Sequence, residues 1–291
     1  MDPFDRIVVG VDGSPASAAG LCWASRRLSK DGELHVVHAF TPIAELAMAA
    51  LQIDWVPLRE EARQKLEGPW TEALTDCSFE THLIDDDPAD ALLVAAERYG
   101  ATTIVVGAHG TPLTHRRLLG GVTRKLLHGA KVPVVVVHRS RDEPDETVRP
   151  IVACIGYGKA AEAAARWATD CAVSLNRPLE LLHSVSNRPF YPKDSAFETL
   201  SSHLGPGATV EWAQSNLDRL VERALERHPD LVASTTIKKG SASQAIMNAG
   251  ETAELVVLGN GMSNIIGPRA KHVLTFGDFA TAVVPTCETS R

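Results

Sequence analysis

The sequence predicts an α/β protein of two tandem Rossmann-like domains, each an open, mainly parallel five-stranded sheet with helices on both faces. Three observations lead to this prediction. The chain has 291 residues, about twice the ~150 residues typical of one domain. Short β-branched apolar runs alternate with longer helical patterns in the first half, as in parallel sheets covered by helices. The second half then repeats the same order of elements, which indicates a duplication.

Five apolar runs in the first half are predicted strands. They are continuous rather than alternating, as expected where both faces of a parallel sheet are buried, and they span 6–11, 33–39, 79–84, 102–106 and 133–138. Four helices are predicted between them, at 15–29, 57–74, 88–98 and 121–129. The first begins with Ser14-Pro15 and the third with Asp87-Pro88, which combine an N-cap with proline at the first helical position.

The repeat also fixes the predicted domain boundary. Its clearest matched pairs are 7–11 with 151–155, 17–29 with 160–172, and 102–107 with 254–259. Between the copies, residues 139–146 are mostly charged and include a proline, a composition typical of a solvated linker. We therefore expect domains at 1–140 and 148–291.

Composition excludes several functional classes. The net charge of −7 disfavours nucleic acid and membrane surfaces as partners, because phosphate neutralisation needs a basic surface. No apolar run approaches the ~18 residues of a spanning helix, and the N-terminus lacks a basic leader. The five cysteines include no C-x-x-C pair, so we expect neither disulfides nor a zinc site, and a cytoplasmic protein.

The loops after the first and fourth predicted strands should form the ligand site, because ligands bind where strand order reverses. The first loop begins with Asp12. The second is rich in glycine, which lets backbone N–H groups approach an anion, and it leads into a helix whose N-terminus attracts negative charge. Its residues of interest are Gly107, Gly110, Gly120, Gly121, Val122 and Thr123. The pattern predicts a phosphate-binding site, beside which Arg116 and Arg117 are candidate charge partners.

These residues resemble those of the universal stress protein family in its tandem two-domain form. ATP-binding members of that family carry Gly-x2-Gly-x9-Gly-(Ser/Thr) in this loop. Gly107, Gly110 and Gly120 match the three glycines, whereas Gly121 stands where the family has a hydroxyl residue. Because one hydroxyl donor is missing, we expect weaker phosphate affinity, although Thr123 offers a hydroxyl nearby.

The resemblance implies ATP as the ligand, with or without Mg²⁺. It places Asp12 beside the nucleoside, Ala39 where backbone groups read adenine, and the glycine loop through Val122 and Thr123 around the phosphates. It also implies that the fifth strands pair the two domains, that the chain forms a homodimer, and that it is a regulatory stress-response protein. Its signal would be nucleotide-dependent conformation or the binding of an unidentified protein partner.

The second half lacks most of this motif. Gly156 replaces the acidic residue, Asn260-Gly261-Met262 changes the glycine spacing, and Arg269-Ala270 stands at the distal glycine pair. We therefore expect that the second domain has lost ATP binding.

Two other functions are compatible with the fold, an adenylating enzyme and a module that binds no nucleotide. No catalytic set is evident, so we expect at most slow ATP hydrolysis. An adenylating α-hydrolase-type enzyme is disfavoured because Asp12 would repel pyrophosphate in the first loop, whereas a nucleotide-independent interaction module stays open. His35 and His38 are three apart on a predicted strand and point to opposite faces, so we interpret them as packing residues rather than a metal pair.

Overall fold

The computed structural model describes residues 2–41, 54–75, 77–108, 119–138, 147–185, 210–260 and 267–286. The predicted linker, Gly110, Arg116, Arg117 and most of both long connections lie outside these residues. The first half contains β1 (Arg6–Gly10), α1 (Pro15–Ser25), β2 (Glu33–Ala39), α3 (Val56–Glu67), β3 (Phe79–Ile84), α4 (Pro88–Arg98), β4 (Thr103–Gly107), α5 (Gly121–Gly129) and β5 (Val134–Val137).

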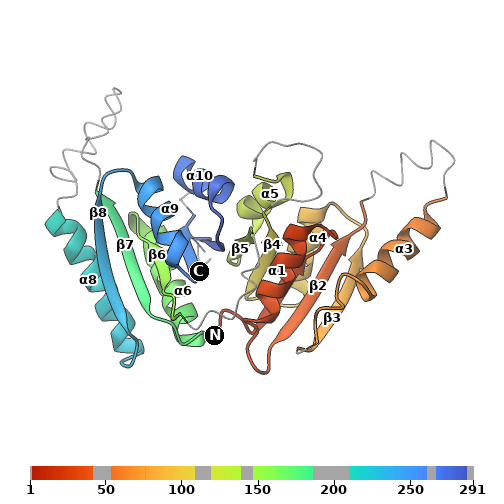
Figure 1. The fold of residues 1–291 in the computed structure, drawn as a ribbon, viewed down its shortest axis with the longest axis horizontal. Helices are drawn as coiled ribbons and strands as arrows, with labels where there is room; N and C mark the ends of the chain where they lie inside the picture. Colours follow the sequence, from red (N-terminus) through yellow and green to blue (C-terminus); the bar gives the residue numbers. More distant parts are fainter. Residues whose placement is uncertain are drawn as a thin grey trace, which may run out of the picture.

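The second half repeats this order, as the sequence predicts (Figure 1). It contains β6 (Ile151–Cys154), α6 (Gly158–Ser174), β7 (Leu179–Val185), α8 (Val210–Arg227), β8 (Ala233–Lys239), α9 (Ala242–Thr252), β9 (Leu255–Gly259), α10 (Pro268–Phe276) and β10 (Thr281–Val284). The strands of each half pair in parallel. The predicted fold class is confirmed.

The ten strands in the described part of the chain form one sheet in the order β3-β2-β1-β4-β5-β10-β9-β6-β7-β8. The one antiparallel pair among these strands joins the halves, with Ala282 of β10 opposite Val135 of β5. Pairing the fifth strands covers two sheet edges that would otherwise be open. Helices cover both faces: Ile7 and Val9 pack in a cluster with α1 and α6 residues, whereas Val8 packs with α4 and α5 residues.

Two helices are shorter than predicted. The helix expected through residue 29 ends at Ser25, because the N–H of Ser29 donates to the Phe4 carbonyl and turns the chain toward β2. The helix expected through residue 74 ends at Glu67. Gly68-Pro69 follows it, and proline disfavours helical backbone at the residue before it.

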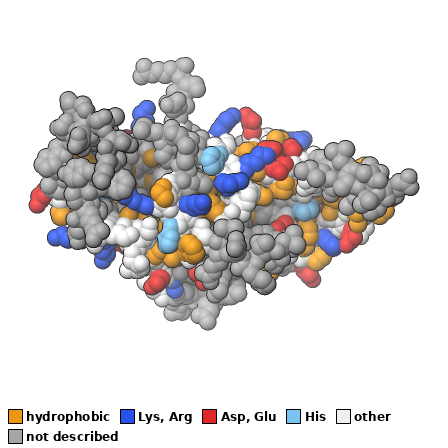
Figure 2. Space-filling view, turned by 90° about the horizontal axis from the view of Figure 1, so that it is seen from above, with side chains coloured by type: hydrophobic (Ala, Val, Ile, Leu, Met, Phe, Trp, Pro, Cys, Tyr) orange, Lys and Arg blue, Asp and Glu red, His pale blue; other side chains and the backbone are white. Residues whose placement is uncertain are grey.

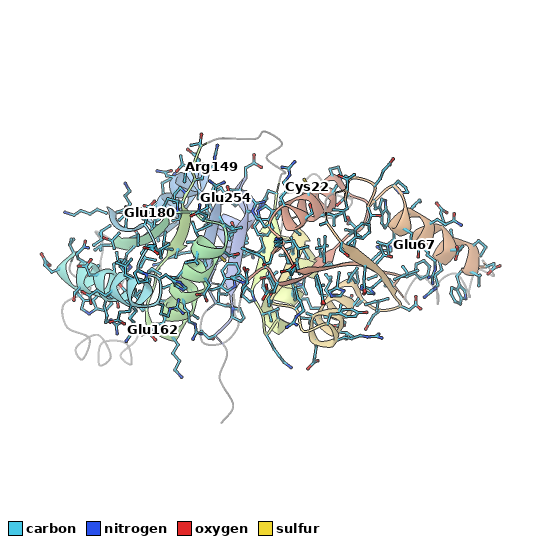
Figure 3. The ribbon with its side chains drawn as sticks, turned by 90° about the horizontal axis from the view of Figure 1, so that it is seen from below. Cys22, Glu67, Arg149, Glu162, Glu180 and Glu254 are labelled. Atoms are coloured by element: carbon cyan, nitrogen blue, oxygen red, sulfur yellow. The ribbon has the colours of Figure 1, made fainter. Side chains whose placement is uncertain are left out.

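Side chains reinforce the junction between the halves. The Phe4 ring is fully buried and meets the rings of Trp23 and Trp167 edge-on, with centroids 5.9 and 6.2 Å away. Arg27 forms an ion pair with Glu254; in Figure 3, Glu254 lies across the junction from α1. Burial lowers the pKa of Arg27, and the neighbouring Glu254 carboxylate opposes that shift.

The surface at the carboxyl ends of the strands is chemically mixed. Figure 2 shows basic, acidic and hydrophobic side chains interspersed over this face rather than gathered into one basic area. Among the described residues, no helix combines the length and apolar character needed to cross a membrane.

Candidate functional site

The candidate site lies at the carboxyl ends of β1 and β4, which are neighbours in the sheet although β2 and β3 intervene in sequence. Strand order reverses here, as the sequence-based argument requires. A cavity of about 300 Å³ opens at this point. Of the eight predicted site residues, seven line it, and Gly110 lies outside the described residues; the seven are Asp12, Ala39, Gly107, Gly120, Gly121, Val122 and Thr123.

One wall of the cavity is the turn from β1 into α1. The Asp12 carboxylate accepts a hydrogen bond from the Ser14 N–H at 3.0 Å, and the Asp12 N–H donates to the Ser17 hydroxyl at 3.3 Å. Ser14 in turn caps α1 by accepting from the Ser17 N–H at 3.1 Å. The Asp12 side chain is therefore held in place while remaining partly exposed. It is the only acidic side chain among the described residues lining the cavity.

The opposite wall is the N-terminus of α5. Gly120 is the N-cap residue and supplies no side-chain hydrogen bond to the helix. The N–H groups of Gly121, Val122 and Thr123 are the first of the helix and have no intrahelical acceptors. The helix dipole adds partial positive charge at the same place. This wall is therefore suited to an anion, and the Asp12 wall to hydrogen-bond donors.

Gly107, at the end of β4, has a packing role of its own. A Cβ atom there would lie 2.5 Å from the backbone carbon of Ala16 and 2.7 Å from the backbone nitrogen of Ser17. Gly259 occupies the matching place in the second half, and a Cβ there would lie 2.3 Å from the Ala160 carbonyl oxygen. Glycine at this position lets the first helix of each half approach the sheet closely, whatever ligand is bound.

The two histidines of β2 have different surroundings. His38 Nδ1 lies 2.8 Å from the Val11 carbonyl oxygen and so links β2 to the turn carrying Asp12. His183 makes the same contact with the Ile155 carbonyl oxygen at 2.7 Å, which extends the predicted repeat to side-chain interactions. His35 is buried on the α4 side of the sheet and contacts His82 and Tyr99 instead.

The cavity also has lining residues that the sequence pattern does not single out, namely Ser17, Pro88 and Leu92. Ser14, which belongs to the predicted loop after the first strand, lines it as well. Ser17 lies in the first turn of α1, and its position beside the cavity depends on the packing of α1 against β4. Pro88 and Leu92 belong to α4, which no motif connects with the two loops.

The second half has a cavity of about 390 Å³ at the matching position, with different chemistry. Arg269 is the single fully charged side chain among the described residues that line it. Burial holds the pKa of the Cys154 thiol well above its usual range, so this lining group stays neutral. His183 also lines the cavity, and no described residue forms a hydrogen bond with its Nε2. Both halves therefore have a cavity at this position, but the cavity of the second half lacks the acidic residue.

Comparisons with known proteins agree with this architecture. The profile of the Universal stress protein family matches residues 3–138 and again residues 147–288. A universal stress protein of Mycolicibacterium smegmatis is 28% identical over 267 residues, which cover 87% of this chain and 86% of that protein. The crystal structure of a universal stress protein from Archaeoglobus fulgidus, 19% identical, superposes with a TM-score of 0.65 and covers 97% of each chain.

A shorter relative matches one half alone. A universal stress protein of Mycobacterium tuberculosis is 31% identical over 150 residues, which cover 47% of this chain and 99% of that protein. The chain is thus similar both to proteins of about its own length and to a protein of about half its length.

Proposed function

The chain belongs to the universal stress protein family, and we propose that it is an ATP-binding regulatory member of that family. The proposal assigns the nucleotide to the domain at 1–140 and treats the domain at 148–291 as a degenerate copy. The observation that supports it is the convergence of Asp12, Ala39 and the start of α5 on one cavity of about 300 Å³. ATP then acts as a conformational or partner-binding signal.

The chemistry of the two walls indicates the orientation in which the nucleotide would bind. Asp12 can accept hydrogen bonds from ribose hydroxyls but would repel phosphates, so it suits the nucleoside end. The first N–H groups of α5 suit the phosphates, because they are unpaired within the helix and lie at its positive end. Ala39, at the end of β2, is near enough to line the same cavity and could contact the base through its backbone.

We also propose that the protein hydrolyses ATP slowly at most. Efficient phosphoryl transfer needs metal ligands, a positioned base and cationic groups around the γ-phosphate. The described residues around the cavity contribute one carboxylate and no lysine or arginine. The nucleotide would therefore be held rather than consumed quickly, which suits a regulator.

The direct test is to purify the chain without added nucleotide, denature it, and identify what is released. We expect ATP, and calorimetric titration of the emptied protein should give one ATP per chain. Asp12→Ala should weaken ATP binding about 10- to 100-fold, because a hydrogen bond to a charged group contributes about 1.5–3 kcal/mol. Asp31→Ala, which removes an exposed carboxylate elsewhere, is the control and should bind normally.

Other outcomes favour the alternatives. A wild-type chain that releases no nucleotide and gives no heat with ATP contradicts the proposal and favours a nucleotide-independent interaction module. Release of pyrophosphate from ATP with an acceptor favours an adenylating enzyme.

Gly121→Ser should tighten ATP binding by about tenfold or more. The substitution supplies the hydroxyl that the family motif has at this position, and a hydrogen bond to a charged phosphate contributes about 1.5–3 kcal/mol. Within the described part of the chain, a Cβ at Gly121 meets no atom within 4 Å and the residue is exposed, so the change costs no packing there. Calorimetry on the nucleotide-free proteins measures the effect.

Gly267→Ser is the matched control for this prediction. It also introduces a Cβ with no atom of the described residues within 4 Å, at the start of α10 in the second half. Its ATP affinity should equal that of the wild type. Equal affinities for all three proteins would show that a hydroxyl at position 121 does not contact the phosphates.

A further inference from the structure

A second cluster of polar side chains lies toward the amino ends of β2 and β3, at the edge of the sheet. His35 stands opposite Glu80 in the strand register, and His82 stands opposite Val37. Glu80 and His82 are two apart and therefore share one face of β3. We propose that His35, Glu80 and His82 bind a divalent transition-metal ion such as Zn²⁺.

The distances within the cluster fit such an ion. His35 Nδ1 lies 3.1 Å from His82 Nε2, and Glu80 Oε2 lies 3.8 Å from each of these nitrogens. A point equidistant from the three atoms is about 2.1 Å from each, which is the usual Zn–N and Zn–O distance. Two imidazoles and one carboxylate are a ligand set that suits zinc and similar ions. Three protein ligands leave further coordination positions for water.

Tyr99 holds the two imidazole rings in this orientation. Its ring stacks on His35 at 4.3 Å and on His82 at 4.5 Å between centroids. Its hydroxyl oxygen lies 3.1 Å from His82 Nδ1. When the hydroxyl oxygen accepts a hydrogen bond from the Nδ1–H, the lone pair of His82 Nε2 is free to bind the ion. A partner on the second ring nitrogen is the usual support of a metal-binding histidine.

Burial and charge also favour a cation. His35 is 5% exposed, and its Nε2 has no hydrogen-bond partner among the described residues. The Glu33 carboxylate lies 3.7 Å from that nitrogen, so two carboxylates flank the buried imidazole. A bound cation would balance this negative charge. The exposed Glu80 side chain leaves the cluster open to solvent, which provides a route for the ion.

The second half shows that the fold does not require this cluster. At the matching register positions, Glu180 stands opposite Ser234, and Thr236 stands two residues further along β8. The corresponding edge of the second half is therefore formed without imidazoles at these positions. The cluster is a property of the first half and calls for an explanation beyond strand pairing.

The test is a calorimetric titration of the metal-free full chain with Zn²⁺, repeated by absorbance with Co²⁺. We expect one ion per chain and an unfolding temperature that rises with Zn²⁺, because an ion that binds only the native state stabilises it. Glu80→Gln and His82→Gln should each weaken Zn²⁺ binding at least about tenfold. Tyr99→Phe should also weaken Zn²⁺ binding, although all three ligands are still present.

Glu180→Gln is the control, since it removes a carboxylate from the corresponding edge of the other half (Figure 3). It should bind Zn²⁺ as the wild type does. A wild type that binds no ion overturns the proposal, and so does undiminished binding in both Glu80→Gln and His82→Gln. None of these substitutions lines the candidate nucleotide cavity, so the outcome is independent of the ATP proposal.

Discussion

Phe4→Ala should lower the free energy of unfolding by about 3–5 kcal/mol, the usual cost of removing a fully buried phenylalanine ring. Phe4 precedes β1, yet its ring lies between Trp23 of α1 and Trp167 of α6. These tryptophans are equivalent in the repeat, so one aromatic side chain packs against both copies. The cavity left by alanine would weaken the first half and its attachment to the second together.

Urea unfolding followed by tryptophan fluorescence measures this effect. The matched control is Phe276→Ala, whose ring is 46% exposed; it should cost much less, because little apolar surface leaves the core. If Phe4→Ala shifts the transition no further than Phe276→Ala, the ring does not contribute to the junction as inferred. A loss of stability confined to the first half would show that the Trp167 contact contributes little.

The fold was predictable because both sheet faces are buried. A strand covered on both sides is largely apolar, so runs such as 102–106 and 133–138 were recognisable to within one residue of their observed ends. The ends of helices were less predictable where they depend on tertiary contacts. The end of α1 depends on a hydrogen bond from Ser29 to Phe4, which local sequence does not reveal.

The candidate site was predictable for a topological reason. Once strand order was assumed, the loop at Asp12 and the loop leading to Gly120 had to meet. The His35–Glu80–His82 cluster was not predicted, because it depends on the register between two strands separated by a long connection. The spacing Glu80-x-His82 was a usable signal, since alternate residues of a strand share a face. Sequence spacing could not identify the third member of the cluster, His35 on β2.

Gly107→Ala should have the other large effect, a loss of about 3 kcal/mol in the free energy of unfolding, at the upper end of the usual range for overpacking. The new Cβ would lie 2.5 Å from the Ala16 backbone carbon. Backbone atoms cannot move aside as a flexible side chain can, so α1 would have to shift away from β4. Ser14 and Ser17 lie on that segment and line the cavity, so ATP affinity should fall as well.

Gly120→Ala separates the packing role of these glycines from a phosphate-binding role. Its Cβ would lie 3.7 Å from the Ala108 carbonyl oxygen and from the Thr123 hydroxyl, which is ordinary contact. Gly120 is the N-cap of α5, where alanine is less favourable than glycine, so the unfolding temperature should fall slightly and far less than in Gly107→Ala. Gly259→Ala should destabilise the chain as Gly107→Ala does, because its Cβ would also meet helix backbone, at Ala160. If the Gly107→Ala protein instead keeps full stability and loses only ATP binding, then Gly107 contacts the ligand directly. The retention of glycine at position 259, in a half that lacks the rest of the motif, favours the packing role.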